Sequence, residues 1–300
     1  MQTQCVEHRP RKGGQGCCGA FKLFPMDLTL QSTVKLNNGV ELPRLGLGVF
    51  RAPRGEVTRQ SVLAALAAGY RHIDTARIYG NERDVGAAVR DSGLPRKDIF
   101  VTTKLWNEDQ GYDSALRACE RSLKDLGLEY VDLYLVHWPV PGRRLDSWRA
   151  LEKLLADGKC RAIGVSNFLE HHLDELLGKA RVVPAVNQVE QHPFLHQPSL
   201  LRYCADKGIV VEAYSPLTKG MRLGDPRVVE LAQKYGKSPA QVLIRWCLEH
   251  GLVVIPKSVH AERIRENASV FDFSFSPEDL RRLDGMNEDL YTGWDPTDVP

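Results

Sequence analysis

Short apolar runs alternate with longer amphipathic stretches along most of the chain. The segment Thr33–Leu42 alternates apolar and polar residues around an Asn-Gly pair, and this pattern predicts a β-hairpin. Eight short apolar runs follow it, and each ends in polar residues or glycine, as buried strands do. These predicted strands are Leu45–Val49, His72–Thr75, Ile99–Thr103, Val131–Val136, Ala162–Val165, Ala185–Val189, Val210–Ala213 and Leu252–Ile255.

Amphipathic stretches with apolar residues three and four positions apart separate these runs, and this spacing predicts helices. They include Val57–Ala68, Ser114–Leu126, Ser147–Ala156, Gln197–Lys207 and Pro239–His250. Strands that alternate with helices form parallel sheets through right-handed crossovers, and eight such units close a barrel. The pattern therefore predicts an α/β fold, the (β/α)8 TIM barrel.

An open, doubly wound sheet is the alternative for the same alternation of strands and helices. That fold normally has a glycine-rich turn after its first strand, leading directly into a helix that holds a pyrophosphate. Here Gly46-Leu-Gly48 continues into Val49-Phe-Arg-Ala-Pro53, which does not begin a helix. The barrel is therefore favoured.

Composition narrows the class of protein. The 300 residues are 43% hydrophobic and 26% charged, as in ordinary globular proteins. One barrel domain needs about 250 residues, so we expect residues 26–300 to form a single catalytic domain and 1–25 a disordered extension. The net charge of +2 is too small to favour nucleic acid or an anionic membrane as partner, and we expect a monomer. No apolar run approaches the roughly 20 residues of a membrane-spanning helix.

The seven cysteines bear on compartment and on metal binding. Four are scattered singly, which is typical of reduced thiols in the cytoplasm: Cys119, Cys160, Cys204 and Cys247. A metal cluster could be imagined from Cys5, His8, Cys17 and Cys18. Adjacent cysteines in a glycine-rich, basic stretch are more typical of a flexible tail, so no metal is expected.

Polar or aromatic residues follow nearly every predicted strand, where the active site of a barrel forms. They are Asp74 with Tyr79 a few residues later, Lys104, Trp106, His137, Trp138, Ser166, Asn167, Gln188, Tyr214, Ser215, Lys257 and Ser258. Taken singly, such an Asp is usually a helix cap, and such a Lys is usually a solvated strand end. Their concentration at one mouth instead predicts a catalytic site.

Four of these residues could together deliver a proton to a substrate: Asp74, Tyr79, Lys104 and His137. A tyrosine with a reference pKa near 10 is a poor acid at neutral pH unless its phenolate is stabilised. The ammonium of Lys104 would lower the pKa of Tyr79, and Asp74 would hold and orient that lysine. His137 would fix a substrate carbonyl by hydrogen bonding. Reduction of the carbonyl also needs a hydride. Since no amino acid supplies one, this chemistry requires a redox cofactor.

Aromatic residues near the same strand ends predict the walls of a substrate pocket. Phe50, Trp106 and Trp138 would line it and exclude water. A barrel hydrolase or isomerase would instead show paired carboxylates or a metal cluster, and Asp74 is the one strand-end carboxylate that stands out. No Ser or Cys has an obvious base partner.

Four segments resemble the aldo-keto reductase family. They are Gly69–Glu82 (GYRHIDTARIYGNE), Val131–Pro139 (VDLYLVHWP), Ala162–Phe168 (AIGVSNF) and Ile255–Asn267 (IPKSVHAERIREN). The likeness is collinear from about Val34 to Trp294. It implies an NADPH-dependent oxidoreductase that reduces aldehydes and ketones, with the catalytic residues Asp74, Tyr79, Lys104 and His137. It also implies that the N-terminal hairpin closes the bottom of the barrel.

The resemblance further implies a binding site for NADPH or NADP+. Ser166, Asn167 and Gln188 would hold the nicotinamide carboxamide, and Tyr214 would stack on its ring, with Ser215 and Leu217 as further contacts. The adenosine 2′-phosphate end would be held by Lys257, Ser258, Arg263, Glu266 and Asn267. The residues themselves agree, because a helix predicted from about His260, together with Lys257 and Arg263, makes an anion site. We expect Lys257 to be buried beside Pro256.

Two short segments indicate the branch of the family. The loop after the fourth strand runs only from Pro139 to about Asp146, and the segment after the seventh runs from Pro216 to Gly224. Both resemble the compact microbial and protozoan branch, which includes diketogluconate reductases and prostaglandin F synthases. We expect small aldehydes, dicarbonyls and quinones as substrates. A prostaglandin F synthase-type endoperoxide reductase is the alternative, and a non-catalytic NADPH-binding subunit is a further one.

Overall fold

The computed structural model describes residues 28–300, so the whole of the expected extension, residues 1–25 with their Cys and His residues, lies outside the described part. Eight strands form one sheet in which each strand pairs in parallel with the next one along the chain. They are β3 (Leu47–Gly48), β4 (His72–Asp74), β5 (Phe100–Leu105), β6 (Val131–Val136), β7 (Cys160–Ser166), β8 (Val186–Glu190), β9 (Val210–Tyr214) and β10 (Val253–Val254). All eight overlap the predicted runs, and their ends differ from the predicted ones by no more than two residues.

The first and last strands of this sheet meet and close it. Leu45 bridges to Val254 and Gly48 to Lys257, both in parallel. The amide of Gly46 donates to the carbonyl of Val254 at 2.9 Å. A Cβ on Gly46 would lie 2.5 Å from Nδ1 of His72, so glycine is required at this point inside the barrel. The predicted (β/α)8 barrel is confirmed.

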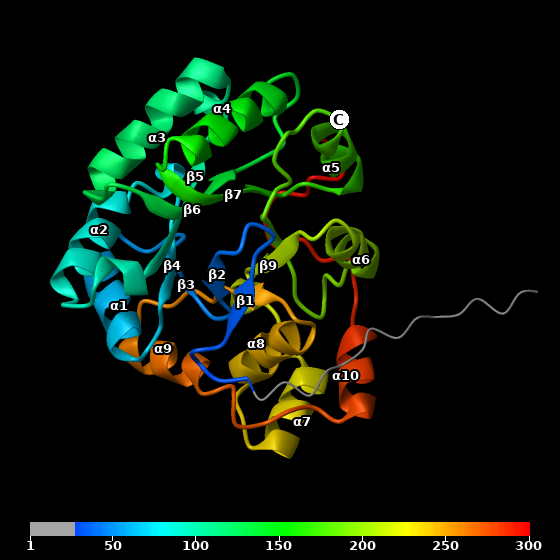
Figure 1. The fold of residues 1–300 in the computed structure, drawn as a ribbon. Coiled ribbons are helices and arrows are strands. Elements are labelled where there is room, and N and C mark those ends of the chain that lie inside the picture. Colours follow the sequence, from blue (N-terminus) through cyan, green and yellow to red (C-terminus); the bar gives the residue numbers. More distant parts are fainter. Residues whose placement is uncertain (1–27) are drawn as a thin grey trace, which may run out of the picture.

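Helices surround the strands on the outside (Figure 1). They are α1 (Glu56–Ala67), α2 (Glu82–Asp91), α3 (Tyr112–Leu126), α4 (Arg144–Ala156), α5 (Glu170–Leu177), α6 (Pro198–Asp206), α7 (Pro226–Tyr235), α8 (Pro239–Glu249), α9 (Ala261–Ala268) and α10 (Pro277–Asp284). A side chain caps the N-terminal end of three of them: Asp225 at α7, Ser238 at α8 and Ser276 at α10. At α8, for example, Ser238 and Gln241 form a reciprocal capping box. The five helices predicted by name are all present.

The predicted hairpin consists of β1 (Thr33–Lys35) and β2 (Glu41–Pro43), paired antiparallel. Its apolar residues Leu36 and Leu42 are buried in one cluster with residues from the strands of the barrel: Phe100, Leu133, Leu135, Ala162, Ala185, Val186 and Val253. In Figure 1 the hairpin lies in front of the barrel opening. It therefore closes the bottom of the barrel, as expected, and the opposite end is the mouth.

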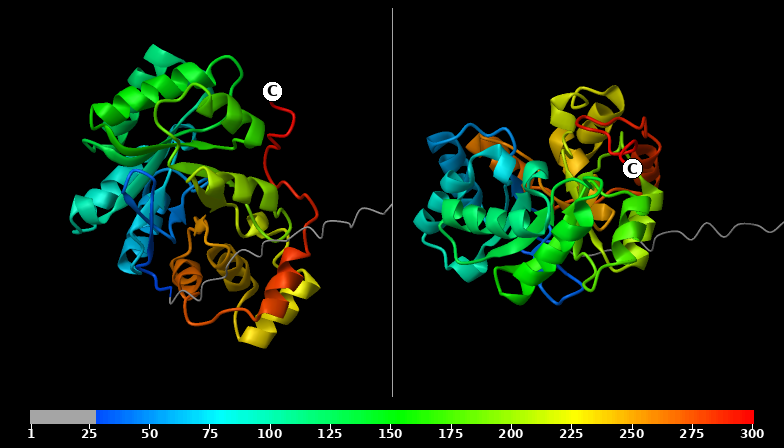
Figure 2. Two further views of the ribbon diagram at one scale, coloured as in Figure 1. Left: turned by 45° about the vertical axis from the view of Figure 1, so that its right-hand side comes forward. Right: turned by 90° about the horizontal axis from the view of Figure 1, so that it is seen from above.

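A C-terminal tail, defined here as residues 285–300, runs along the outside after α10. Figure 2 shows it in red, passing α6 and ending beside α5. The carbonyl of Val299 lies 2.7 Å from Nε2 of His172, and Arg144 donates to the carbonyl of Pro300 at 2.6 Å. The loop after β6 is short, since α4 already begins at Arg144. The end of the tail therefore contacts α4 and α5.

Four cysteines of the described residues are buried free thiols, in agreement with the prediction: Cys119, Cys160, Cys204 and Cys247. Between residues 28 and 300, no helix combines the length and the apolar character needed to cross a membrane.

Candidate active site

Three strand ends bring the expected catalytic residues together at the mouth. Asp74 ends β4, Lys104 lies near the end of β5, and His137 follows β6. Tyr79 ends a single 3-10 turn, Arg77–Tyr79, in the loop after β4. Its hydroxyl oxygen lies 3.4 Å from the Lys104 ammonium nitrogen. All four predicted residues thus come from neighbouring βα units.

Lys104 is completely buried and fully hydrogen-bonded. Its ammonium donates to both carboxylate oxygens of Asp74, at 2.7 and 2.8 Å, and to the carbonyl of Thr75 at 2.8 Å. Burial lowers the pKa of Lys104, but Asp74 and Tyr79 more than offset this, so that the pKa is raised overall. Burial raises the pKa of Asp74, and Lys104 opposes that rise. The lysine therefore stays charged beside the tyrosine hydroxyl.

Tyr79 differs from the expectation in one respect. Its pKa is raised from the ordinary value, because burial outweighs the opposing effect of Lys104. The prediction of a net lowering by the lysine is wrong for this structure, since it left out desolvation. Tyr79 is thus a fully protonated phenol at neutral pH, with a fixed cation next to the oxygen that would carry the charge after proton loss.

His137 is an uncharged imidazole. Burial and the charge of Lys104 hold its pKa well below the usual range. Its Nδ1 is buried and has no hydrogen-bond partner among residues 28–300, which leaves Nε2 as the nitrogen able to reach a ligand. A neutral ring can donate one hydrogen bond without bringing a second positive charge close to Lys104.

Aromatic rings lie next to Tyr79 and His137. The ring of Phe50 lies 5.0 Å from that of Tyr79, and the ring of Trp106 lies 5.3 Å from that of His137. Trp138 packs edge-on against Trp294 of the C-terminal tail, at 5.3 Å. The three residues predicted to line a substrate pocket thus lie in the loops after β3, β5 and β6, and their role in binding substrate stays a prediction. Trp294, which is 67% exposed, was missed because nothing in its local sequence indicates where the tail runs.

The predicted amide-binding residues form one hydrogen-bonded group at the ends of β7, β8 and β9. Ser166 donates to the carbonyl of Gln188 at 2.8 Å, and Tyr214 donates to the side-chain oxygen of Asn167 at 2.8 Å. Asn167 in turn donates to the carbonyl of His137 at 3.0 Å, which joins this group to the catalytic residues. Asn167 and Ser215 both have a positive φ, of 63° and 50°. Such strained residues cluster at functional sites.

Beneath this group lies a carboxylic acid that the sequence analysis did not identify. Glu212 of β9 is completely buried inside the barrel, and the Gln188 amide donates to it at 2.9 Å and to Asp74 at 2.8 Å. Burial and the neighbouring Asp74 raise the pKa of Glu212 to about 8. Alternation along Val210–Tyr214 could have revealed it, because position 212 shares the inward face with position 214.

The residues predicted to bind the adenosine 2′-phosphate end of the cofactor are only partly arranged as expected. Lys257 is exposed, so the expectation of its burial is wrong; its bridge to Gly48 fixes only its backbone. Arg263 on α9 is also exposed, and neither cation forms an ion pair with a carboxylate of residues 28–300. Ser258 accepts from the amide of His260 at the start of α9. Three further predicted contacts are less exposed than these cations: Leu217, Glu266 and Asn267.

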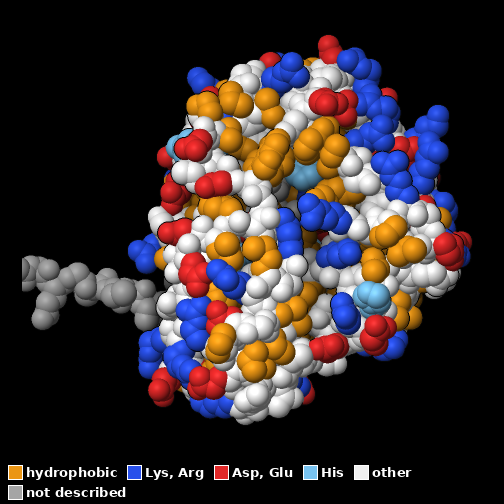
Figure 3. Space-filling view, turned by 180° about the vertical axis from the view of Figure 1, so that it is seen from behind, with side chains coloured by type: hydrophobic (Ala, Val, Ile, Leu, Met, Phe, Trp, Pro, Cys, Tyr) orange, Lys and Arg blue, Asp and Glu red, His pale blue; other side chains and the backbone are white. Residues whose placement is uncertain are grey.

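The mouth is therefore divided in two. Aromatic residues come from the loops after β3, β5 and β6, and the amide group and the free cations come from the ends of β7 to β10. Figure 3 shows this face, on which hydrophobic side chains lie next to a central gathering of Lys and Arg around a hollow. Such a division suits a ligand with an anionic end that presents its reactive end to an apolar pocket.

Comparison with known proteins identifies the family. The model of the family described as "Aldo/keto reductase family" matches residues 44–288. This chain belongs to the aldo/keto reductase family. It is thus an oxidoreductase by family, and the resemblance noted in the four sequence segments is confirmed.

Several members of the aldo/keto reductase family match nearly the whole chain. "Glyoxal reductase" of Bacillus subtilis (strain 168) is 52% identical over 274 residues, which cover 91% of this chain and 99% of that protein. "9,11-endoperoxide prostaglandin H2 reductase" of Trypanosoma cruzi (strain CL Brener) is 52% identical over 266 residues, covering 88% and 94%. The crystal structure of MGS-M4, an aldo-keto reductase from a deep-sea metagenome library, superposes with a TM-score of 0.86 at 47% identity, covering 89% and 99%.

Proposed function

We propose that this aldo/keto reductase reduces aldehydes and ketones to alcohols with NADPH, and that Tyr79 is the proton donor. The observation that carries the proposal is the 3.4 Å contact between the Tyr79 hydroxyl and the buried Lys104 ammonium, next to the ring of Phe50. This arrangement delivers a proton to an oxygen atom and stabilises the phenolate left behind.

Each catalytic residue has one task in this proposal. His137, held neutral, donates a hydrogen bond that fixes the substrate carbonyl, and the Tyr79 hydroxyl gives its proton to the carbonyl oxygen. Lys104 stabilises the resulting phenolate, and Asp74 holds the lysine in place. NADPH, when bound, supplies the hydride for the carbonyl carbon. The apolar rings keep water away from the reacting atoms.

The residues of the second half of the mouth suit a nicotinamide cofactor. The side-chain nitrogen of Gln188 already donates to two carboxyl groups, while its amide oxygen accepts no hydrogen bond from the described residues and can accept one from a carboxamide. Asn167 and Ser166 would complete this contact, and the Tyr214 ring would stack on the nicotinamide. Lys257 and Arg263, both without a carboxylate partner in residues 28–300, favour a 2′-phosphate and hence NADPH over NADH.

Small aldehydes, α-dicarbonyls and quinones are the proposed substrates. The short loop after β6 leaves the pocket shallow, so the far end of a bulky rigid ligand contributes little binding energy. The name of the Bacillus subtilis relative supports a dicarbonyl. The Trypanosoma cruzi relative supports a prostaglandin endoperoxide as a second candidate, since a flexible lipid can bend along an open groove.

A substrate panel tests the proposal. We would measure kcat/KM from NADPH consumption with methylglyoxal, 9,10-phenanthrenequinone, a prostaglandin endoperoxide and a 3-ketosteroid. The dicarbonyl and the quinone are expected to rank above the steroid. A steroid that outperforms the quinone would overturn the shallow-pocket argument and leave the reductase assignment intact. No turnover of any carbonyl, together with tight NADPH binding, would instead indicate a binding subunit.

We also propose that the protein is a cytoplasmic monomer. Four buried thiols without disulfides suit a reducing compartment. Size-exclusion chromatography with light scattering tests the monomer, because a dimer would give twice the mass of 33.7 kDa.

A further inference from the structure

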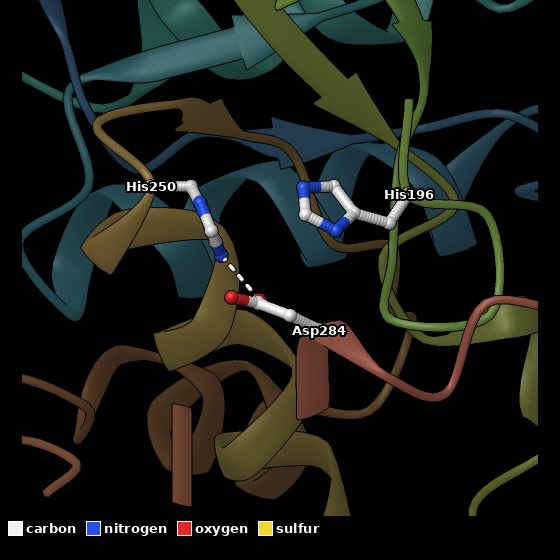
Figure 4. A group of neighbouring side chains, drawn as sticks. All are labelled: His196, His250 and Asp284. Atoms are coloured by element: carbon white, nitrogen blue, oxygen red, sulfur yellow. Dashed lines mark hydrogen bonds and ion pairs between the residues drawn. The ribbon is translucent and has the colours of Figure 1, made fainter. Parts of the chain in front are cut away.

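Three potential metal ligands meet outside the barrel, on elements that are far apart in sequence (Figure 4). His196 lies in the loop between β8 and α6, His250 caps the C-terminal end of α8, and Asp284 is the last residue of α10. One ligand atom from each lies within 4.8 Å of the other two. Because the three positions are separated by dozens of residues, no short sequence motif indicates that they lie together.

We propose that His196, His250 and Asp284 form a binding site for Zn²⁺ that fastens the C-terminal tail to the barrel. Two imidazoles and one carboxylate are a ligand set that Zn²⁺ takes up readily, with water in the fourth position. Figure 4 shows the His250 ring joined to the Asp284 carboxylate by a hydrogen bond, with the His196 ring beside them.

The distances suit a small tetrahedral ion. Zn²⁺ bonds of about 2.0–2.1 Å place neighbouring ligand atoms about 3.3 Å apart. Nε2 of His250 lies 2.8 Å from Oδ1 of Asp284, and the most distant pair lies within 4.8 Å. The required spacing falls between these values, so side-chain rotations suffice. The side chains of His250 and Asp284 are 16% and 30% exposed, which leaves a path for the ion from solvent.

A second set of contacts holds the ligands in place. The indole nitrogen of Trp246 donates to Oδ1 of Asp284 at 2.8 Å, and the ring of His196 packs edge-on against the Trp246 ring at 5.1 Å. Asn287 accepts from the backbone amide of His196 at 3.0 Å. Such outer contacts orient metal ligands and raise affinity.

The position of the site indicates what the ion would do. Just beyond Asp284, the amides of Glu288 and Leu290 donate to the carbonyl of Phe194, at 3.1 and 3.0 Å. The tail then reaches Glu190 at the end of β8 and brings Trp294 against Trp138 at the mouth. An ion that joins α8, α10 and the loop of His196 would therefore stabilise the anchor of the tail. This role does not depend on the proposed reaction.

A simpler account is a latch made of hydrogen bonds alone, in which Asp284 accepts from Trp246 and His250. Two variants separate the accounts. His196→Ala removes a metal ligand and leaves both of those hydrogen bonds in place. Asp284→Asn keeps an oxygen acceptor for both donors and removes the anionic ligand.

The test uses the full-length, untagged chain, freed of metal with a chelator that is then removed. Cys5, Cys17 and Cys18 are changed to Ser so that thiols of the N-terminal segment do not bind the ion. Zn²⁺ is titrated by calorimetry, and Co²⁺ by its visible absorption spectrum. We expect one Zn²⁺ per chain, a tetrahedral Co²⁺ spectrum, and a Tm that rises by several degrees with saturating Zn²⁺.

In the protein that carries the three Cys→Ser changes, His196→Ala and Asp284→Asn are each expected to weaken Zn²⁺ binding by about 100-fold or more. Each should also abolish the rise in Tm. The matched control is His171→Ala, an exposed histidine that contacts the other end of the tail through Val299, and it should bind Zn²⁺ normally. Zn²⁺ binding that survives His196→Ala, that is lost in His171→Ala, or that is absent from the outset would overturn the proposal.

Discussion

Asp74 and Glu212 accept hydrogen bonds from the same atom, the side-chain nitrogen of Gln188, at 2.8 and 2.9 Å. Among residues 28–300, Lys104 is the one cation close to these two buried acids, and it is bound to Asp74 through both carboxylate oxygens. One acid is thus ionised and the other is neutral, because burying two negative charges beside one positive charge is unfavourable. The neutral one is Glu212, whose pKa burial and Asp74 raise to about 8.

This assignment makes stability depend on pH. In the unfolded chain Glu212 loses its proton near pH 4.5, and in the folded protein near pH 8. Between these values the folded state binds more protons, so the unfolding free energy falls as pH rises, by at most about 1.4 kcal/mol per pH unit. Glu212→Gln is expected to remove this decline. Urea unfolding at about pH 6 and about pH 8 measures it.

The matched control is Glu120→Gln, at an exposed position of α3, which should keep the decline of the wild type. If the unfolding free energy falls equally steeply with pH in the wild type and in Glu212→Gln, Glu212 is already ionised at neutral pH.

The ion pair of Lys104 and Asp74 is expected to contribute to stability and to catalysis, and two variants separate these contributions. Lys104→Met leaves a buried carboxylate unpaired and should lower the unfolding free energy by about 3–5 kcal/mol, with loss of turnover. Adding Asp74→Asn removes the unpaired charge and should restore most of the stability without restoring turnover. Urea unfolding and NADPH consumption are measured on the same samples. Recovery of turnover together with stability would show that Lys104 is needed only for folding.

Arg263 is expected to determine the preference for NADPH over NADH. We expect a preference of one to three orders of magnitude in kcat/KM, equivalent to about 1.4–4 kcal/mol. Arg263→Ala should remove most of it by weakening NADPH alone. Arg265→Ala, an exposed arginine on the same helix, is the matched control and should leave the preference intact. Equal losses with both cofactors in Arg263→Ala would indicate a structural role.

Much of the site was predictable because strand ends in a barrel have a fixed location. Once eight apolar runs indicated a barrel, Asp74, Lys104 and His137 had to meet at one mouth, and they do. Glu212 escaped notice because it interrupts an apolar run by a single residue, and its burial depends on the register between β8 and β9. The exposure of Lys257 depends on side-chain direction, which the strand pattern does not determine.

The path of the C-terminal tail was beyond sequence reasoning for a different reason. Its contacts, such as that of Thr292 with Glu190 and that of Trp294 with Trp138, join residues more than a hundred positions apart. No local pattern encodes such pairs. The left-handed backbone of Asn167 was equally hidden, because the surrounding structure imposes it on a residue that is not glycine.

Trp294 is expected to contribute to the binding of larger substrates. An aromatic pair is worth about 0.5–1.5 kcal/mol, so Trp294→Ala should raise KM for 9,10-phenanthrenequinone by about twofold to tenfold. Methylglyoxal, which is too small to span the pocket, should be little affected. Val183→Ala, an exposed apolar residue next to the hairpin, is the control. Equal changes for both substrates would mean that the tail acts on folding or on the cofactor.

The most direct test of the central claim is kcat of Tyr79→Phe, measured beside NADPH binding by fluorescence titration. The variant removes only the hydroxyl oxygen, which lies 3.4 Å from the Lys104 nitrogen, and keeps the ring that packs on Phe50. A general acid contributes about 100-fold to 10,000-fold, so kcat should fall by that factor while the Kd for NADPH stays within about twofold. Tyr112→Phe, in α3, should behave as wild type. If Tyr79→Phe retains more than about a tenth of the wild-type kcat, Tyr79 is not the proton donor.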